Sequence, residues 1–258
     1  RGEAQRDFGD AVGIGCRTVV EGLFGILPDV PAGRLTIRPG FPDSWERARM
    51  QHPDFVFDYR RDGRAETYSI QSMFSRPMSI RLEIPARGTK IEHAAVNGQA
   101  VRWNSLREAV GRPRIEISSD PAAQVNIRIL WKGSKPEGPK DSAAAAQGSI
   151  LRAQYNEARI IQLEDPQHVL ADGVRFSGNS FEARVQGTPG HRSVFLHLRQ
   201  GGMSWQSPVS FELREPYEIL PSEQKPDDCL RFRLRNNTNE KINANAVIQV
   251  NQQSKKSP

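Results

Sequence analysis

Polar and apolar residues alternate along most of the chain after residue 34, as they do in β-strands with one buried face. Segments such as "RLTIRP", "FVFDYRR", "SIRLEIP" and "NIRILW" follow this period of two. Asp62-Gly63 and Asn97-Gly98 are turn pairs typical of tight β-hairpins. We therefore expect about eight short strands between Arg34 and Trp131, arranged as an antiparallel sandwich.

The alternation stops in "KGSKPEGPKDSAAAAQGS", which contains no bulky apolar residue and is typical of a linker. It resumes in "RIIQLEDP", "HRSVFLHLRQGG" and "SPVSFELREPYEIL", which predict a second β unit. The last segment, "CLRFRLRNNTNEKINANAVIQVN", predicts two strands that either complete this unit or begin a further module. The fold class expected is mainly β: residues 31–133 form one sandwich, 134–149 a linker and 150–258 a second, immunoglobulin-like sandwich.

The first 30 residues follow a different period. Apolar positions between Gly9 and Ile26 are spaced as in a helix, and "LPDVP" is expected to end that helix. Its five glycines (Gly9, Gly13, Gly15, Gly22 and Gly25) lower helix propensity, and these small residues let other helices approach closely. A single helix of this kind gains little stability alone. We therefore interpret residues 1–30 as the terminal helix of a helical domain that lies upstream.

Composition and charge narrow the range of functions. Of the 258 residues, 37% are hydrophobic and 26% charged, which is typical of a globular chain, and no apolar run reaches the length of a membrane span. The net charge of +6 comes from cations scattered along strands, without a stacking platform of aromatic residues, so nucleic-acid binding is not expected. Cys16 and Cys229 have no neighbouring ligands at metal-binding spacing, and neither a metal nor a cofactor is expected.

The junction carries a resemblance to a known family. "EGLFGILPD" followed by "GRLTIRPGFPDSWERA" resembles the passage that joins the (α/α)6 barrel of bacterial six-hairpin glycosidases to a C-terminal β-sandwich, as in α-L-rhamnosidases. "LEDPQHVL" and "VFLHLRQGGMSWQSPVSFEL" are similar to the β domain that follows in a Bacteroidetes-type group of glycosidase-like proteins. The resemblance implies that this chain is the C-terminal region of such a protein.

The function implied is an accessory one. The β domains would pack on a helical catalytic barrel of the same polypeptide, which acts on plant or microbial polysaccharide in the periplasm or outside the cell. A free-standing carbohydrate-binding module and a purely structural immunoglobulin-like spacer are the alternatives. The chain alone is not expected to be catalytic, because one helix cannot place two carboxylates on either side of a glycosidic bond.

Few residues are candidates for a site. Glu3, Asp7, Asp10 and Glu21 are the carboxylates in or near the expected helix, and Glu3 lies in what the resemblance implies is the last barrel loop, where sugar contacts occur. Trp205, in the loop-like "GGMSWQSP", is the best candidate for an aromatic sugar platform. The five histidines are dispersed without catalytic or metal-binding spacing.

One packing expectation concerns the junction itself. "GLFGILPD" and "PGFPDSW" each end in a rigid turn, and a large apolar contact would be needed to fix the helix against the sheet. We expect Trp45 to be buried between the helix and the first sandwich, with Phe24, Ile26 and Phe41 as its neighbours.

Overall fold

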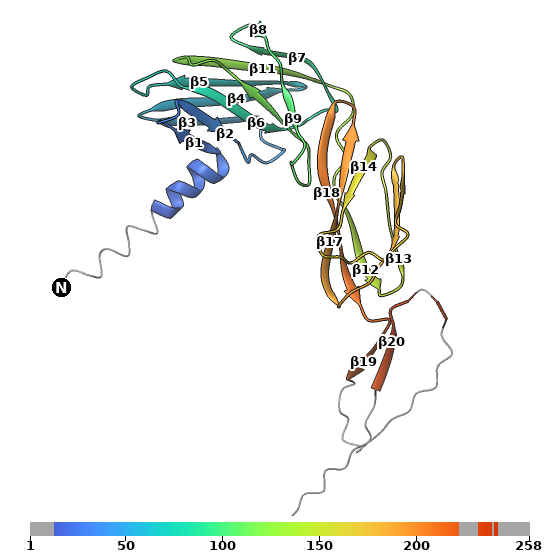
Figure 1. Cartoon of the computed structure of the whole chain (residues 1–258). Helices are drawn as coiled ribbons and strands as arrows, with labels where there is room; N and C mark the ends of the chain where they lie inside the picture. Colours follow the sequence, from blue (N-terminus) through green and yellow to red (C-terminus); the bar gives the residue numbers. More distant parts are fainter. Residues whose placement is uncertain (1–12, 222–231, 239, 242–258) are drawn as a thin grey trace, which may run out of the picture.

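The computed structural model describes residues 13–221, 232–238, 240 and 241. It confirms a mainly β protein with a single short helical segment in the described part (Figure 1). Most strand pairs are antiparallel, as expected, and two pairs among the described strands are parallel. In the described residues, no helix has both the length and the apolar character that crossing a membrane requires.

The first sandwich is built from two sheets that share one apolar core. The smaller sheet has the order β1 (Ile26–Asp29), β2 (Arg34–Ile37), β6 (Ser79–Pro85), β10 (Arg114–Ser118) and β9 (Asn104–Leu106). The larger sheet has the order β3 (Arg47–His52), β4 (Phe55–Asp62), β5 (Ala65–Ser72), β11 (Gln124–Lys132), β7 (Lys90–Val96) and β8 (Gln99–Ala100). Buried and exposed residues alternate along most of β4, β5 and β11. The alternation of apolar and polar residues in the sequence therefore predicted these strands.

Both predicted hairpin turns are confirmed. Gly63, between β4 and β5, has φ +54°, and Asn97 and Gly98, between β7 and β8, have φ values of +49° and +82°. At Asn97-Gly98, positive φ at both central positions gives the two-residue turn whose twist matches the twist of paired strands. Between β4 and β5 the central residues are Gly63 and Arg64, and of these only Gly63 has positive φ.

The second sandwich begins inside the expected linker. Its larger sheet has the order β12 (Lys140–Ala146), β18 (Met203–Arg214), β17 (Gly190–Gln200) and β14 (Arg159–Glu164). The smaller sheet has the order β13 (Ile150–Gln154), β16 (Ser180–Arg184) and β15 (Arg175–Ser177). The interpretation of 134–149 as a linker is therefore wrong for β12, an edge strand parallel to β18. Its alanines are small, so they give no visible alternation although Ala145 and Ala146 are buried.

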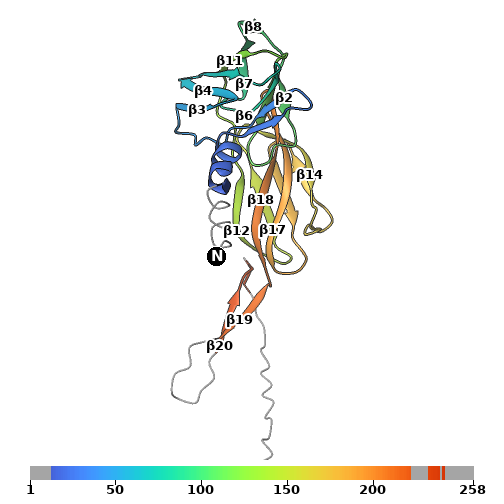
Figure 2. The same cartoon turned by 90° about the vertical axis from the view of Figure 1, so that its left-hand side faces the viewer.

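The last described strands form a separate ribbon. β19 (Tyr217–Pro221) and β20 (Phe232–Asn236) pair with each other, and their sheet contains no other described strand. Figures 1 and 2 both show this ribbon beyond the end of the second sandwich. The first strand expected in the last segment is β20, which pairs with β19 and with neither sheet of the second sandwich, whereas the second expected strand lies outside the described residues.

The helix ends earlier in the sequence than expected. Residues 13–23 are helical, and the last six, Thr18–Leu23, form a π-helical segment. Gly25 ends it with φ +65°, and a Cβ at this position would lie 2.0 Å from the carbonyl oxygen of Arg38. The expectation that the helix extends to Ile26 and stops at "LPDVP" is therefore wrong, because Gly25 breaks it and Ile26 already belongs to β1.

Trp45 is not buried at the junction. Its side chain stacks on Phe41 with ring centroids 5.7 Å apart, and the residue is 38% exposed. Phe24, Ile26 and Phe41 are buried as expected, and Phe24 meets the Phe41 ring edge-on at 5.2 Å. The expected burial of Trp45 is wrong because the two phenylalanines fill the seam, which leaves the indole on the outer side of Phe41.

Candidate binding clefts

The two substrate-binding residues proposed from sequence have different outcomes. Glu3 lies outside the described residues, as do Asp7 and Asp10. Trp205 is fully buried in β18, opposite Leu198 of β17, so the prediction that it forms an exposed sugar platform is wrong. The loop signal came from Gly201 and Gly202, which form the β17–β18 turn, whereas Trp205 already follows the strict alternation of β18.

Glu21, the remaining carboxylate candidate, lies on the exposed helix. It accepts a hydrogen bond from Arg17 Nε at 2.8 Å, one helical turn away. Both side chains are largely in solvent, so this pair is an ordinary surface ion pair of small energetic value.

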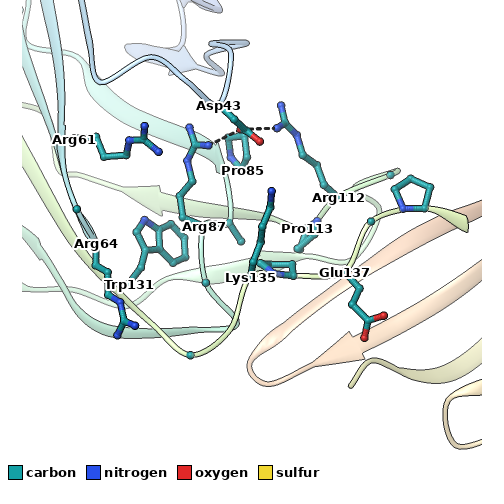
Figure 3. Close-up of a pocket in the computed structure, with 18 residues that line it drawn as sticks. Asp43, Arg61, Arg64, Pro85, Arg87, Arg112, Pro113, Trp131, Lys135 and Glu137 are labelled. Carbon is teal, nitrogen blue, oxygen red and sulfur yellow. Dashed lines mark hydrogen bonds and ion pairs between the residues drawn. The ribbon is translucent and has the colours of Figure 1, made fainter. Parts of the chain in front are cut away.

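A cleft of about 670 Å³ opens beside the segment that connects the two sandwiches (Figure 3). We call it the basic cleft, because five cations line it: Arg61, Arg64, Arg87, Arg112 and Lys135. They come from the end of β4, the β4–β5 turn, the loop after β6, the loop before β10 and the connecting segment. The other lining residues are mostly glycines and prolines, with two carboxylates, Asp43 and Glu137.

Asp43 lies between two of these cations. Its carboxylate pairs with Arg87 and, at 3.3 Å, with Arg112, and Figure 3 shows both guanidinium groups directed at it. Burial favours the neutral acid, but the charges of Arg87, Arg112 and Lys135 outweigh burial and lower the pKa of Asp43. Asp43 therefore remains ionised and occupies the centre of the cationic group.

The remaining cations have no such partner. No ion pair is found for Arg61, Arg64 or Lys135 within the described part of the chain. Figure 3 shows the Lys135 side chain rising between Arg87 and Arg112. The cleft therefore keeps an excess of positive charge after Asp43 is counted.

A buried carboxylate fixes the position of Arg87. Glu66 is 1% exposed and accepts hydrogen bonds from Tyr59 Oη at 3.0 Å, Trp131 Nε1 at 2.8 Å and Arg87 Nε at 3.2 Å. Burial, together with the charge of Glu66, raises the pKa of Tyr59 to about 12, so the phenol remains a hydrogen-bond donor at neutral pH. Arg87 is thus held in place by two carboxylates: its Nε donates to the buried Glu66 and its Nη1 donates to Asp43.

Glu137 ties the cleft to the second sandwich. Its carboxylate accepts hydrogen bonds from the backbone N–H groups of Asn156, Glu157 and Ala158 at 2.6–3.0 Å. Its own backbone N–H donates to Gln200 Oε1 at 2.9 Å. The acidic group is engaged with backbone of the second sandwich and does not neutralise the cations of the cleft, and Figure 3 shows it directed away from them.

The Glu137 contacts predict a pH dependence of stability. Burial opposes ionisation, but the three backbone N–H donors and Lys140 outweigh it and lower the pKa of Glu137 below its ordinary value of 4.5. A carboxyl group whose pKa is lowered in the folded state stabilises that state above its unfolded pKa, and the contribution is lost as the pH falls through the folded pKa. Glu137→Gln should therefore lower the melting temperature at pH 7 and have a shrinking effect below pH 4.5.

Thermal unfolding of the wild-type chain and of Glu137→Gln at both pH values measures this effect. Glu182→Gln is the matched control, because it removes a solvent-accessible carboxylate that pairs with the exposed Arg152. A loss for Glu137→Gln that is equally large at acid pH would contradict the prediction.

A second hollow, of about 750 Å³, lies where the two sandwiches meet. Half-buried Trp103 lines it, together with Arg107, Arg199, Gly202 and Ser204. Ser105 Oγ donates to the carbonyl of Ser204 and accepts from its N–H, and Gly202 N–H donates to the carbonyl of Thr89, so the first sandwich holds the β17–β18 turn and the start of β18. The sequence predicts a loop at Trp205, but the glycine turn that gives this signal lies next to Trp103.

The sequence contains a signal for the basic cleft that the sequence reasoning missed. In "RRDGR", "ARG", "GRP" and "GSKP" an arginine or lysine lies beside a glycine or proline in a connection between strands. Each is unremarkable alone, and the scattered distribution of cations argued against a positive patch. The four connections become one cleft only because the two sheets bring their ends together.

Neither the comparison with protein-family models nor that with curated proteins finds a match for this chain. Within the residues described, no group of three or more His, Cys, Asp or Glu side chains is arranged to hold a metal ion.

Proposed function

We propose that this chain is the accessory β-sandwich region of a glycoside hydrolase-like protein, and that it packs on and supports a helical catalytic barrel upstream in the same polypeptide. The protein acts on plant or microbial polysaccharide in the periplasm or outside the cell. The observation that carries the proposal is a helix, attached to the first sandwich at one end, whose described residues include no buried side chain.

The attached end of the helix is well defined. Val20 and Leu23 pack against the core of the first sandwich, and the carbonyl of Leu23 accepts a hydrogen bond from Gly40 N–H at 2.9 Å. Figures 1 and 2 both show the helix projecting from the first sandwich. These contacts fix the orientation of the C-terminal end of the helix against the first sandwich.

The rest of the helix surface is uncovered. Ile14 is 65% and Val19 46% exposed, and a Cβ built on Gly13 or Gly15 would have no neighbour within 4 Å. A helix in a protein gains most of its stability from packing of its faces and little from its own propensity. Exposed apolar residues beside glycines allow close contact with other helices. The barrel proposed upstream would supply those helices.

The carboxylates of the basic cleft support an accessory role over a catalytic one. Hydrolysis of a glycosidic bond requires an acid and a carboxylate that face the same sugar. Asp43 is held between Arg87 and Arg112, and Glu137 is bound to backbone N–H groups. Neither is free to protonate a leaving group or to attack a sugar carbon.

Cys16 offers a direct test, because it lies on the exposed helix as a free thiol. In a Cys229→Ser background, a thiol reagent should modify Cys16 rapidly in the 258-residue chain. In the longer polypeptide that includes the upstream sequence, the packed barrel should slow the reaction by at least about tenfold, since protection follows the free energy of local opening. Equal rates, or an upstream sequence without a long helical domain, would refute the proposal.

The Trp103 hollow favours a second candidate, a carbohydrate-binding module that works on its own. Tryptophan faces and nearby polar groups are the usual means of holding a sugar ring in such modules. Titration of the isolated chain with neutral oligosaccharides, compared with Trp103→Ala, tests this candidate. Binding that Trp103→Ala abolishes supports it, and absence of binding rejects it.

A further inference from the structure

We propose that the basic cleft binds the anionic groups, carboxylate or sulfate, of an acidic oligosaccharide. The identification of the ligand as a saccharide rests on the proposed function, whereas the preference for an anion rests on the cleft itself. The chain would then hold a charged stretch of polysaccharide beside the catalytic domain.

The charge balance is the first argument. Five cations line the cleft, and of its two carboxylates only Asp43 faces them, since Glu137 is engaged by three backbone N–H groups. Glu66, beneath the cleft, offsets one further charge through Arg87. Three of the five cations, Arg61, Arg64 and Lys135, have no ion-pair partner among the described residues and are thus left for a ligand.

The position of Asp43 is the second argument. Arg87 and Arg112 already hold one carboxylate, and Lys135 contributes to lowering its pKa. Arg87 and Arg112, with Arg61 at the side of the cleft, provide the planar donors that recognise carboxylate and sulfate oxygens, and Lys135 adds a further positive charge (Figure 3).

The walls are rigid, which is the third argument. Pro85, Pro113 and Pro136 restrict the backbone of three lining segments. At Gly88 a Cβ would lie 2.6 Å from the carbonyl oxygen of Lys132, so the loop with Arg87 packs directly on β11. Donors held in place before binding lose less entropy when a ligand arrives.

The lining also favours a saccharide over a nucleic acid. Its aromatic residue, Trp131, is 2% exposed and donates its indole N–H to Glu66. Single-stranded nucleic acids are bound by exposed aromatic faces on which bases stack, and this cleft presents no such face. A sugar acid can be held by its charged groups without a stacking platform.

Calorimetric titration of the 258-residue chain tests the proposal. The ligands are a short oligogalacturonate, a heparin-derived sulfated oligosaccharide, a maltooligosaccharide without charge, and a single-stranded oligonucleotide. We expect binding of at least one acidic saccharide, weakening as salt is raised, and none of the uncharged one. The two acidic ligands distinguish carboxylate from sulfate as the preferred group. Tighter binding of the oligonucleotide, or equal binding of the uncharged saccharide, would overturn the proposal.

Variants locate the binding site. Arg112→Gln combined with Lys135→Gln should weaken the acidic ligand by about tenfold or more, since each charged hydrogen bond carries a large share of the affinity. Arg128→Gln is the matched control, because Arg128 is an exposed cation on β11 outside the cleft. Circular dichroism checks that all variants are folded. The proposal would be refuted if the double variant and Arg128→Gln lost affinity equally, or if the wild-type chain bound neither acidic saccharide.

The test of the anion-binding cleft and the test of the proposed function can fail independently of each other. The Cys16 protection experiment concerns the helix, and the titration concerns the cleft. A chain that fails to bind acidic saccharides can still pack on an upstream barrel, and an anion-binding cleft can exist without one.

Discussion

Glu66→Ala is expected to destabilise the first sandwich by about 3–5 kcal/mol, as removal of one partner from a buried ion pair does in other proteins. Glu66 accepts hydrogen bonds from a phenol, an indole and a guanidinium group in a position that is 1% exposed. The alanine variant leaves Tyr59, Trp131 and Arg87 without this acceptor. Arg87 keeps its pair with Asp43, which places the loss within this range and not above it.

Denaturant unfolding of the wild-type chain, Glu66→Ala and Glu66→Gln measures the effect. The glutamine variant keeps one acceptor oxygen but not the charge, so it should show an intermediate loss. Glu92→Ala is the control, because Glu92 is half exposed and its pairing distance to Lys132 is 4.0 Å. If Glu66→Ala costs no more than Glu92→Ala, the buried network does not hold the sandwich as we describe.

Trp205→Ala should destabilise the second sandwich by about 3–5 kcal/mol, the usual cost of truncating a large buried aromatic residue. Trp205 is among the largest fully buried side chains, and it lies opposite Leu198 near the turn end of the pairing between β17 and β18. Its indole N–H has no hydrogen-bond partner within the described residues. Trp205→Phe therefore removes no hydrogen bond seen there and should cost less, on the order of 1 kcal/mol.

Trp45→Ala provides the comparison, since Trp45 is 38% exposed and rests on Phe41 alone among its aromatic neighbours. Its truncation should cost about 1 kcal/mol, the value of an aromatic pair at a partly exposed site. Unfolding followed by circular dichroism and calorimetry distinguishes these losses. A Trp205→Ala variant that melts like the wild-type chain but loses affinity for sugars would restore the sequence-based prediction for this residue.

Local signals predicted the part of the fold that depends on neighbouring residues. The alternation along β4, β5 and β11 identified their buried faces, because the side-chain period of a strand is fixed by backbone geometry. Asn97-Gly98 identified a hairpin because few other pairs tolerate positive φ at both positions. The same reasoning failed at β12, whose small alanines give no contrast between its faces, and at Gly25, where the close approach of Arg38 ends the helix.

The sequence by itself determined that this protein is mainly β, with strands and turns at positions set by local periodicity and glycine. It did not determine which tryptophan is buried, because Trp45 and Trp205 exchange their expected environments through contacts with Phe41 and with β17. The basic cleft was decided only by tertiary structure. Its cations are separated by up to 74 positions between Arg61 and Lys135, and they meet because β4 and β6 end, and β10 begins, on the same side of the sandwich as the connecting segment. Charge attraction and burial act through space, so a reading along the chain does not bring these residues together.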